Sequence, residues 1–240
     1  MKKHFVLVHG VCHGAWCWYK LKPLLECAGH RVTTLDLAAS GINVMKLHEV
    51  LTIHDYSQPL MDIMASLPPG EKVILVGHSL GGLNLALAMD KFPLKISAAV
   101  FLTAFLPESW SDTQFLPYGS PENPATSVLF GPKFMSSKLY QLSPLKDLTM
   151  ATMLIRPGSL FLEDLSKAEI FSKEGYGSVT RSFIICKGDI AMTVNFQRWM
   201  IDNDGGVKEV KEIEGADHMA MLSKPEELCH CLLEITERCP

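Results

Sequence analysis

A serine between glycines, on a predicted strand–turn–helix, is the feature of this sequence that points most directly to chemistry. The segment Gly77-His78-Ser79-Leu80-Gly81 follows an apolar run and opens a helical pattern. In a nucleophile elbow, small residues flank the serine, so the tight turn can lift its hydroxyl to a helix N-terminus. A phosphate-binding loop is disfavoured because no lysine followed by serine or threonine comes after the glycines. The pattern predicts Ser79 as a nucleophile, with an accidental glycine-rich turn as the alternative.

A serine hydroxyl needs a base to take its proton, and two histidines follow Ser79 in the chain. When an elbow serine is used, the chain order is serine, then acid, then histidine. His218 lies in a loop between the last predicted strand and the last predicted helix, whereas His230 lies within that helix. We therefore predict His218 as the base and a surface or packing role for His230.

The acid that orients the base is predicted to be Asp189, which directly follows a predicted strand. Asp217 is the alternative, but adjacent residues rarely present a carboxylate to the neighbouring imidazole. Asp202 and Asp204 lie in a polar, glycine-containing surface turn and are less favoured.

An oxyanion hole requires two backbone N–H donors. The residue after the nucleophile, Leu80, supplies one, and the loop after the first strand supplies the other, with Val11 as the best candidate. Gly10 and Gly14 permit that loop to approach a substrate closely. The neighbouring histidines are predicted to be hydrogen-bonded loop residues and not catalysts: His9, His13 and His78.

Metal sites and cofactors are not expected. Cys12 with His9 and His13 lacks the fourth ligand of a structural zinc site. Three consecutive helical residues point in different directions, which disfavours the run Cys229-His230-Cys231. The seven cysteines are odd in number and mostly apolar in context, so we expect free thiols in a reducing cytoplasm.

The elements that must position these residues alternate between strand and helix patterns. Strands are predicted at residues 4–9, 31–36, 72–77, 97–103, 182–187 and 207–213, and helices at 16–28, 53–67, 82–92 and 224–238. Such alternation indicates parallel pairing through right-handed crossovers. The expected fold class is α/β, with a mostly parallel sheet and helices on both faces.

One segment interrupts this alternation. Residues 107–177 contain many prolines and glycines and short helical stretches near 133–140, 144–153 and 160–171. An insertion of this size between two strands usually covers the site at the strand ends. We therefore predict a core formed by residues 1–106 and 178–240, with residues 107–177 as a cap.

Composition limits the partners. The chain has 240 residues, 48% hydrophobic and 20% charged, with a formal net charge of -4. This is typical of a soluble globular protein and shows no electrostatic attraction to nucleic acid or acidic lipid. The N-terminal apolar run is too short for a secretory signal, and no run approaches the roughly 18 residues of a membrane span. We expect a small-molecule partner, and the sequence leaves a homodimer open.

Five segments carry a resemblance to a known family. They are residues 4–16, 19–25, 35–41, 69–82 and 215–222. In them the chain resembles the plant methylesterase and hydroxynitrile lyase family of α/β-hydrolases, in the esterase branch that includes salicylate-binding methylesterases and polyneuridine aldehyde esterase. The resemblance implies the α/β-hydrolase fold and a triad of Ser79, Asp189 and His218. It also implies hydrolysis of methyl esters of salicylate, jasmonate, indole-3-acetate or an alkaloid carboxylate.

The chain departs from the family after Phe105, where relatives carry an additional helix and loops, so the cap is expected to be shortened. The residues predicted to line an apolar substrate pocket are Gly10, Phe105, Trp110, Phe115 and Met219. A plain core role is the alternative for the four large side chains.

Two other functions compete with a serine carboxylesterase. A hydroxynitrile lyase needs a positive charge to stabilise cyanide, and the resemblance places it on a lysine after the catalytic histidine, with a threonine in the first loop. This chain has Met219 and Gly10 at those positions. A non-catalytic hormone-binding protein would keep the pocket without turning over an ester, and the complete set of triad residues argues against it.

Overall fold

One parallel sheet organises the chain. The computed structural model describes residues 2–106, 119–120, 123–124, 127–165 and 171–238. Its main strands are β1 His4–Val8, β2 Arg31–Thr34, β3 Val73–His78, β4 Ile96–Leu102, β7 Arg181–Cys186 and β8 Val207–Ile213. They form one sheet in the order β2-β1-β3-β4-β7-β8, and every neighbouring pair is parallel.

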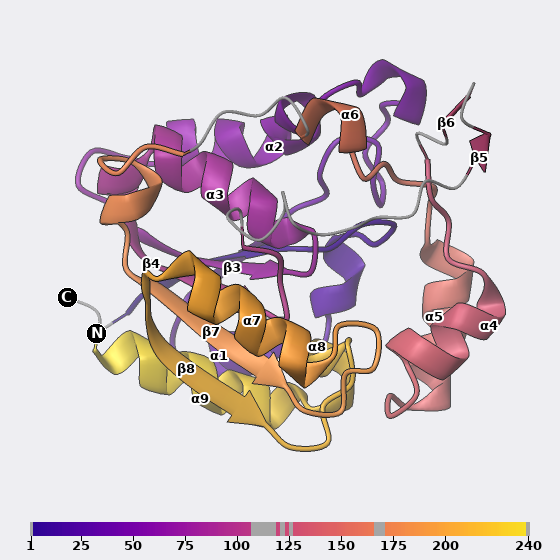
Figure 1. Ribbon diagram of the computed structural model, residues 1–240. Helices are drawn as coiled ribbons and strands as arrows, with labels where there is room; N and C mark the ends of the chain where they lie inside the picture. The colour runs from indigo at the N-terminus through magenta and orange to yellow at the C-terminus, as the bar shows by residue number, and fades with distance from the viewer. Residues whose placement is uncertain (1, 107–118, 121–122, 125–126, 166–170, 239–240) are drawn as a thin grey trace.

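Helices cover both faces of this sheet. They are α1 Leu21–Cys27, α2 Ile53–Ser66, α3 Gly81–Lys91, α7 Val194–Asp204, α8 Ala220–Ser223 and α9 Pro225–Glu237. Helices α2, α3 and α7 pack on one face, and α1, α8 and α9 pack on the other (Figure 1). Along β1, Phe5 and Leu7 belong to one apolar core, whereas Val6 and Val8 belong to the other. Because successive strand side chains alternate between the two faces of the sheet, both faces must be apolar. The predicted α/β fold class is confirmed.

Three of the described core helices differ from the sequence prediction: α1, α7 and the short α8, which precedes the helix predicted from residue 224. The pattern over residues 16–28 divides into a 3₁₀ turn, Ala15–Trp18, and α1, which begins at Leu21. This start places Pro23 in the first helical turn, where its missing N–H has no intrahelical partner to lose. Helix α7 was not predicted, although Thr193 caps its first turn and Gly205 ends it at a φ of 62°.

Short turns complete the core. They are the 3₁₀ segments Leu47–Glu49, Pro93–Lys95 and Tyr176–Ser178. Within the described residues, no helix combines the length and apolar character needed to cross a membrane.

The described residues of the predicted cap form short elements. They are β5 Gly119–Ser120, β6 Asn123–Pro124, α4 Pro132–Phe134, a π-helical turn Met135–Leu139, α5 Leu145–Leu154 and α6 Leu162–Leu165. Val128 and Gly158 pair as an antiparallel bridge between its two halves. The described helices fall within or beside the three predicted helical stretches. The boundaries of the cap at residues 107 and 177 stay a prediction.

The loops that carry the predicted site residues leave the sheet at one edge. In a parallel sheet all carboxyl ends meet at the same edge, where ligands of α/β proteins usually bind. Residues 9–14 follow β1, Ser79 follows β3, Asp189 follows β7 and His218 follows β8. In Figure 1 the arrowheads of β7 and β8 point toward the side of the molecule where α4 and α5 lie. Helices α4 and α5 of the predicted cap therefore lie on the side from which these loops emerge (Figure 1).

Candidate active site

Ser79 occupies the strained turn that the sequence predicts between β3 and α3. Its φ is 54°, a left-handed value that is uncommon for residues with a side chain. A Cβ added to Gly77 would lie 2.8 Å from Leu85, and one added to Gly81 would lie 2.9 Å from the carbonyl oxygens of Val8 and His9. Larger residues cannot replace either glycine without movement. Backbone strain that the surroundings enforce is typical of functional sites.

Asp189 and His218 are joined by a short hydrogen bond. His218 Nδ1 lies 2.7 Å from Asp189 Oδ2, and both side chains are buried. Because a carboxylate accepts, the imidazole carries its hydrogen on Nδ1, which leaves Nε2 as an acceptor for a proton. Asp189 is itself held in place, since its Oδ1 accepts 2.8 Å hydrogen bonds from the backbone N–H groups of Ala191 and Met192.

The charges of this pair shift both pKa values. Burial lowers the pKa of His218, but the charge and hydrogen bond of Asp189 outweigh burial and raise that pKa above 6.5. Burial raises the pKa of Asp189, but the charge of His218, the hydrogen bonds from His218 and Met192 N–H, and that from Thr103, together hold it below its ordinary value. Asp189 therefore makes the buried imidazole a stronger base than burial alone would allow.

The neighbour of Ser79 connects the serine turn to the histidine loop. His78 Nε2 donates a 2.8 Å hydrogen bond to the backbone oxygen of His218, and the two rings lie 4.7 Å apart between centroids. Burial lowers the pKa of His78 well below its ordinary value, so the ring stays neutral. His78 thus holds the backbone of His218 beside the turn that carries Ser79.

The loop after β1 lies against Ser79. A Cβ on Gly10 would be 2.9 Å from the Cβ of Ser79, so only glycine allows this approach. Within the part of the chain that the structure describes, the backbone N–H groups of Val11 and Leu80 make no hydrogen bond. An oxyanion hole requires two such backbone N–H groups, free to bind the substrate oxygen beside the serine.

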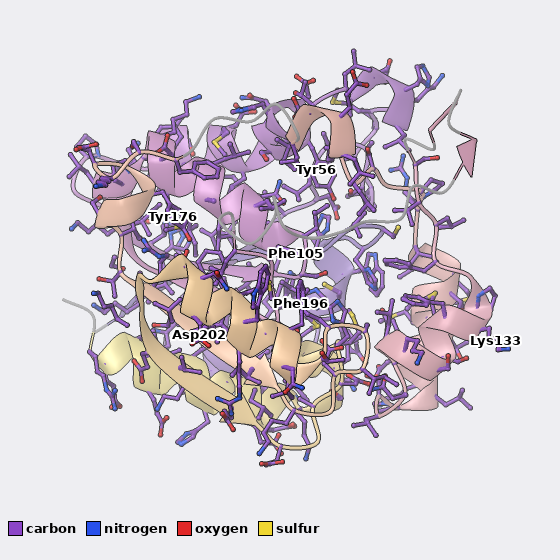
Figure 2. The ribbon with its side chains drawn as sticks, in the orientation of Figure 1. Tyr56, Phe105, Lys133, Tyr176, Phe196 and Asp202 are labelled. Atoms are coloured by element: carbon purple, nitrogen blue, oxygen red, sulfur yellow. The ribbon has the colours of Figure 1, made fainter. Side chains whose placement is uncertain are left out.

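The other predicted acids have separate roles. Asp217 accepts hydrogen bonds from Leu142 N, Ser143 Oγ and Met219 N, at 3.0, 2.8 and 3.0 Å. Asp204 forms an ion pair with Arg181. Asp202 is exposed on α7 (Figure 2).

His230 is 73% exposed and pairs with Glu234 on the same helix. The flanking Cys229 and Cys231 are buried, so the three consecutive side chains point in different directions.

The histidines of the first loop are engaged in local hydrogen bonds. His9 binds Gly10 O through Nδ1 and accepts from the N–H of Leu37 through Nε2. His13 binds Val11 O through Nδ1 and the hydroxyl of Tyr140 through Nε2. Burial lowers the pKa of His13 to about 4. Cys12 Sγ donates to Val128 O. Among the described residues no group of three or more metal-binding side chains occurs.

The predicted pocket residues have different positions. The backbone N–H of Phe105 donates a 3.0 Å hydrogen bond to Ser79 O, and its half-buried ring meets that of Phe196 edge to face at 6.3 Å (Figure 2). Met219 is 0% exposed and packs in the apolar core with α1, α8 and α9. Trp110 and Phe115 lie outside the described residues.

Three contributors were missed by sequence reasoning. They are Thr103, whose hydroxyl binds Asp189 at 2.7 Å, Tyr140 and Phe196. Thr103 follows β4 at the same sheet edge as the other site residues, a position that signals its role.

Known proteins resemble this chain over nearly its whole length. A profile of the alpha/beta hydrolase family matches residues 5–230. The chain is 59% identical over 255 residues to salicylic acid-binding protein 2 of Nicotiana tabacum, covering 98% of each. It is 54% identical over 257 residues to methylesterase 1 of Arabidopsis thaliana, covering 99% of this chain and 97% of that one.

A solved structure agrees with these matches. Polyneuridine aldehyde esterase of Rauvolfia serpentina is 52% identical over 98% of this chain and 96% of its own. Its crystal structure superposes with a TM-score of 0.90, covering 98% of this chain and 100% of the crystallised one.

Proposed function

Because the chain belongs to the alpha/beta hydrolase family, we propose that it is a serine carboxylesterase that hydrolyses methyl esters of small plant acids. Its relatives include a named methylesterase and an aldehyde esterase, and they confirm the predicted family resemblance. The observation that carries the proposal is the 2.7 Å hydrogen bond from His218 to Asp189, on loops bound through His78 to the strained Ser79 turn.

The proposed reaction uses an acyl-enzyme. Ser79 Oγ attacks the ester carbonyl carbon while His218 Nε2 takes its proton, and Asp189 stabilises the imidazolium that forms. The N–H groups of Val11 and Leu80 bind the oxyanion of the tetrahedral intermediate. His218 then gives its proton to the leaving methoxide, so that methanol departs. Water, activated by His218, hydrolyses the acyl-enzyme and regenerates Ser79, with no metal or organic cofactor.

Several features support a small apolar acyl group. The backbone of Phe105 is hydrogen-bonded to Ser79 O, and its ring packs on Phe196, which supports an apolar surface suited to an aromatic or terpenoid acid. The alignment with the tobacco protein runs over 255 positions, more than the 240 residues of this chain, so that relative carries residues that this chain lacks. We propose that these residues are missing from a shortened cap, formed by residues 107–177 on a core of 1–106 and 178–240. The six described cysteines are free thiols, which supports a cytoplasmic location.

A non-catalytic small-molecule binding protein is the second candidate. The tobacco relative is named as a salicylic acid-binding protein, and a protein can bind a carboxylic acid without turning over an ester. The lyase alternative is weakened, because Gly10 leaves no space for a threonine and Met219 is buried in the core.

One assay separates these candidates. Methyl salicylate, methyl jasmonate, methyl indole-3-acetate and an alkaloid methyl ester are each incubated with the protein, and the free acid is quantified. Binding of each acid is measured by calorimetry in the same preparation. We expect hydrolysis of at least one ester by the wild type. Acid binding without hydrolysis of any ester would favour the binding protein and overturn the proposed function.

A further inference from the structure

Four consecutive residues of the predicted cap contact three of the loops that form the candidate active site. These residues, Tyr140, Gln141, Leu142 and Ser143, form a turn between the π-helical segment and α5, and we call them the cap turn. We propose that the cap turn is a positioning element, which holds the loops of Asp189, His218 and Val11 in register. The inference deepens the proposed esterase function and rests on it for its kinetic test.

The first contact is with the histidine loop. The carboxylate of Asp217, directly before His218, accepts hydrogen bonds from Leu142 N at 3.0 Å and Ser143 Oγ at 2.8 Å. Asp217 is 0% exposed, and in the described part of the chain it forms no ion pair. A buried carboxylate requires hydrogen-bond donors. Among the described residues, the carboxylate of Asp217 accepts three hydrogen bonds, and the cap turn donates two of them. Movement of the cap turn would therefore move the histidine loop with it.

The second contact is with the acid loop. Gln141 Nε2 donates a 2.7 Å hydrogen bond to the backbone oxygen of Gly188, the residue before Asp189. The side chain of Leu142 covers Gly188, so closely that an added Cβ would lie 2.6 Å from it. Gly188 N in turn donates to Ala216 O at 2.8 Å, which joins the acid and histidine loops to each other. One turn thus contacts the residues directly before both members of the Asp189–His218 pair.

The third contact is with the candidate oxyanion loop. His13 Nδ1 binds the oxygen of Val11, a carbonyl that can only accept, so Nδ1 carries the hydrogen. The hydroxyl of Tyr140 therefore donates its 2.7 Å hydrogen bond to His13 Nε2. Both side chains are buried, and their rings stack at 6.0 Å.

The cap turn is itself anchored to the core. In α5, which follows it, Asp147 accepts hydrogen bonds of 2.5 Å from Tyr19 and from Lys20. Lys20 also donates to Leu222 O at 3.0 Å. Because the turn is fixed at this end, it can hold the loops that it contacts in place. The position of these loops matters, since a displacement of about 1 Å in a catalytic group can lower the rate about 100-fold.

The test removes or weakens the hydrogen bonds that the cap turn makes to the loops. Ser143→Ala, Tyr140→Phe and Asp217→Asn are compared with the wild type, and Ser143→Thr restores the hydroxyl. Ser137→Ala is the matched control, because Ser137 makes only a local 2.7 Å hydrogen bond to Lys133 O in the same part of the cap. Each protein is assayed for kcat and KM, for its melting temperature, and by ¹H NMR for the low-field signal of the His218 Nδ1 proton.

We expect kcat to fall about 3- to 10-fold in Ser143→Ala and Tyr140→Phe, and about 10- to 100-fold in Asp217→Asn, with little change in KM. The His218 proton signal should shift or broaden in Ser143→Ala and Asp217→Asn. Ser143→Thr and Ser137→Ala should match the wild type in both measurements. Should Asp217→Asn fail to fold, the two cap-side variants still decide the question.

A lower melting temperature with unchanged kcat and an unchanged proton signal would show a purely structural role and overturn the inference. The NMR measurement does not depend on turnover. If the wild type hydrolyses no ester, the proposed function fails, and the response of the proton signal to Ser143→Ala alone then decides whether the cap turn positions His218.

Discussion

Thr103 donates a 2.7 Å hydrogen bond to Oδ2 of Asp189, the same oxygen that accepts the imidazole hydrogen of His218. Thr103 follows β4, the strand between the serine strand and the acid strand. Thr103, Asp189 and His218 follow the adjacent strands β4, β7 and β8, so these three strands contribute to one hydrogen-bonded group. The carboxylate is oriented by its neighbours before any substrate binds.

Removing the hydroxyl of Thr103 should weaken this orientation. In Thr103→Val the shape of the side chain is kept and the hydrogen bond is lost, and we expect kcat/KM for a methyl ester to fall about 10-fold. Thr103→Ser keeps the hydroxyl and is the control. Equal kcat/KM in Thr103→Val and the wild type would show that the hydrogen bond does not orient Asp189.

Ser79→Ala should abolish ester turnover and leave the fold and acid binding intact. The substitution removes one oxygen and creates no large cavity, and a residual rate of roughly 10³-fold over water can persist from the oxyanion donors and binding. Hydrolysis of p-nitrophenyl acetate and the melting temperature are measured in parallel. Hydrolysis at the wild-type rate would exclude Ser79 as the nucleophile.

Asp189→Asn should cost about 10⁴-fold in kcat, because the amide favours the wrong imidazole tautomer. Asp217→Asn should cost less, since Asp217 contacts the cap turn and not the ring of His218. Single-turnover rates of the two variants are compared. A larger loss in Asp217→Asn would reverse the assignment of the acid.

The pH dependence of kcat/KM should report His218. Its pKa is raised above 6.5, chiefly by Asp189 acting against burial, with a further contribution from Asp217. The base must be neutral, so activity should increase as pH rises through a value above 6.5. In Asp189→Asn burial remains while the charge is lost, and the acidic limb should move to lower pH. An acidic limb that does not move in Asp189→Asn would contradict this origin of the shift.

The same pKa shift affects stability. A raised histidine pKa stabilises the folded state below pH 6.5, and this contribution is lost as pH rises through the folded pKa. As pH falls below the pKa of His218, activity should therefore be lost while the His218–Asp189 interaction is kept. Circular dichroism at each pH is the control that separates inactivation from unfolding.

Mandelonitrile should be cleaved more slowly than methyl esters are hydrolysed. Met219 supplies no positive charge, and a Cβ at Gly10 would meet Ser79 at 2.9 Å. Gly10→Ala should for this reason lower ester hydrolysis by displacing Ser79. Cyanide release and ester hydrolysis are measured in one preparation, and faster cyanide release would refute the esterase assignment.

Local patterns were sufficient to predict the fold class, and they also nominate the residues of the candidate site. Apolar runs bounded by glycine and proline predicted the inner strands of the main sheet, because strands buried on both faces must be apolar throughout. The edge strand Val207–Ile213 was a weaker prediction, since its residues alternate between half-buried and exposed positions. Ser79, Asp189 and His218 are predicted as site residues because each directly follows a strand or lies between a strand and a helix. These are properties of neighbouring residues, so the sequence alone contains them. Helix α7 has a cap at Thr193 and a stop at Gly205, and it was missed although its signals are local.

Tertiary structure decided the contacts between residues far apart in the chain. Asp217 is adjacent to His218 in the chain and Asp189 is 29 residues away, yet Asp189 contacts the imidazole ring while Asp217 contacts the cap turn. The sequence predicted Met219 as a pocket residue, with a core role as the alternative, and its side chain is fully buried in the core. The partners Thr103 and Tyr140 lie 86 and 127 residues from the groups they bind. A hydrogen bond depends on distance and angle in space, and no local pattern in the sequence specifies which distant donor meets which acceptor.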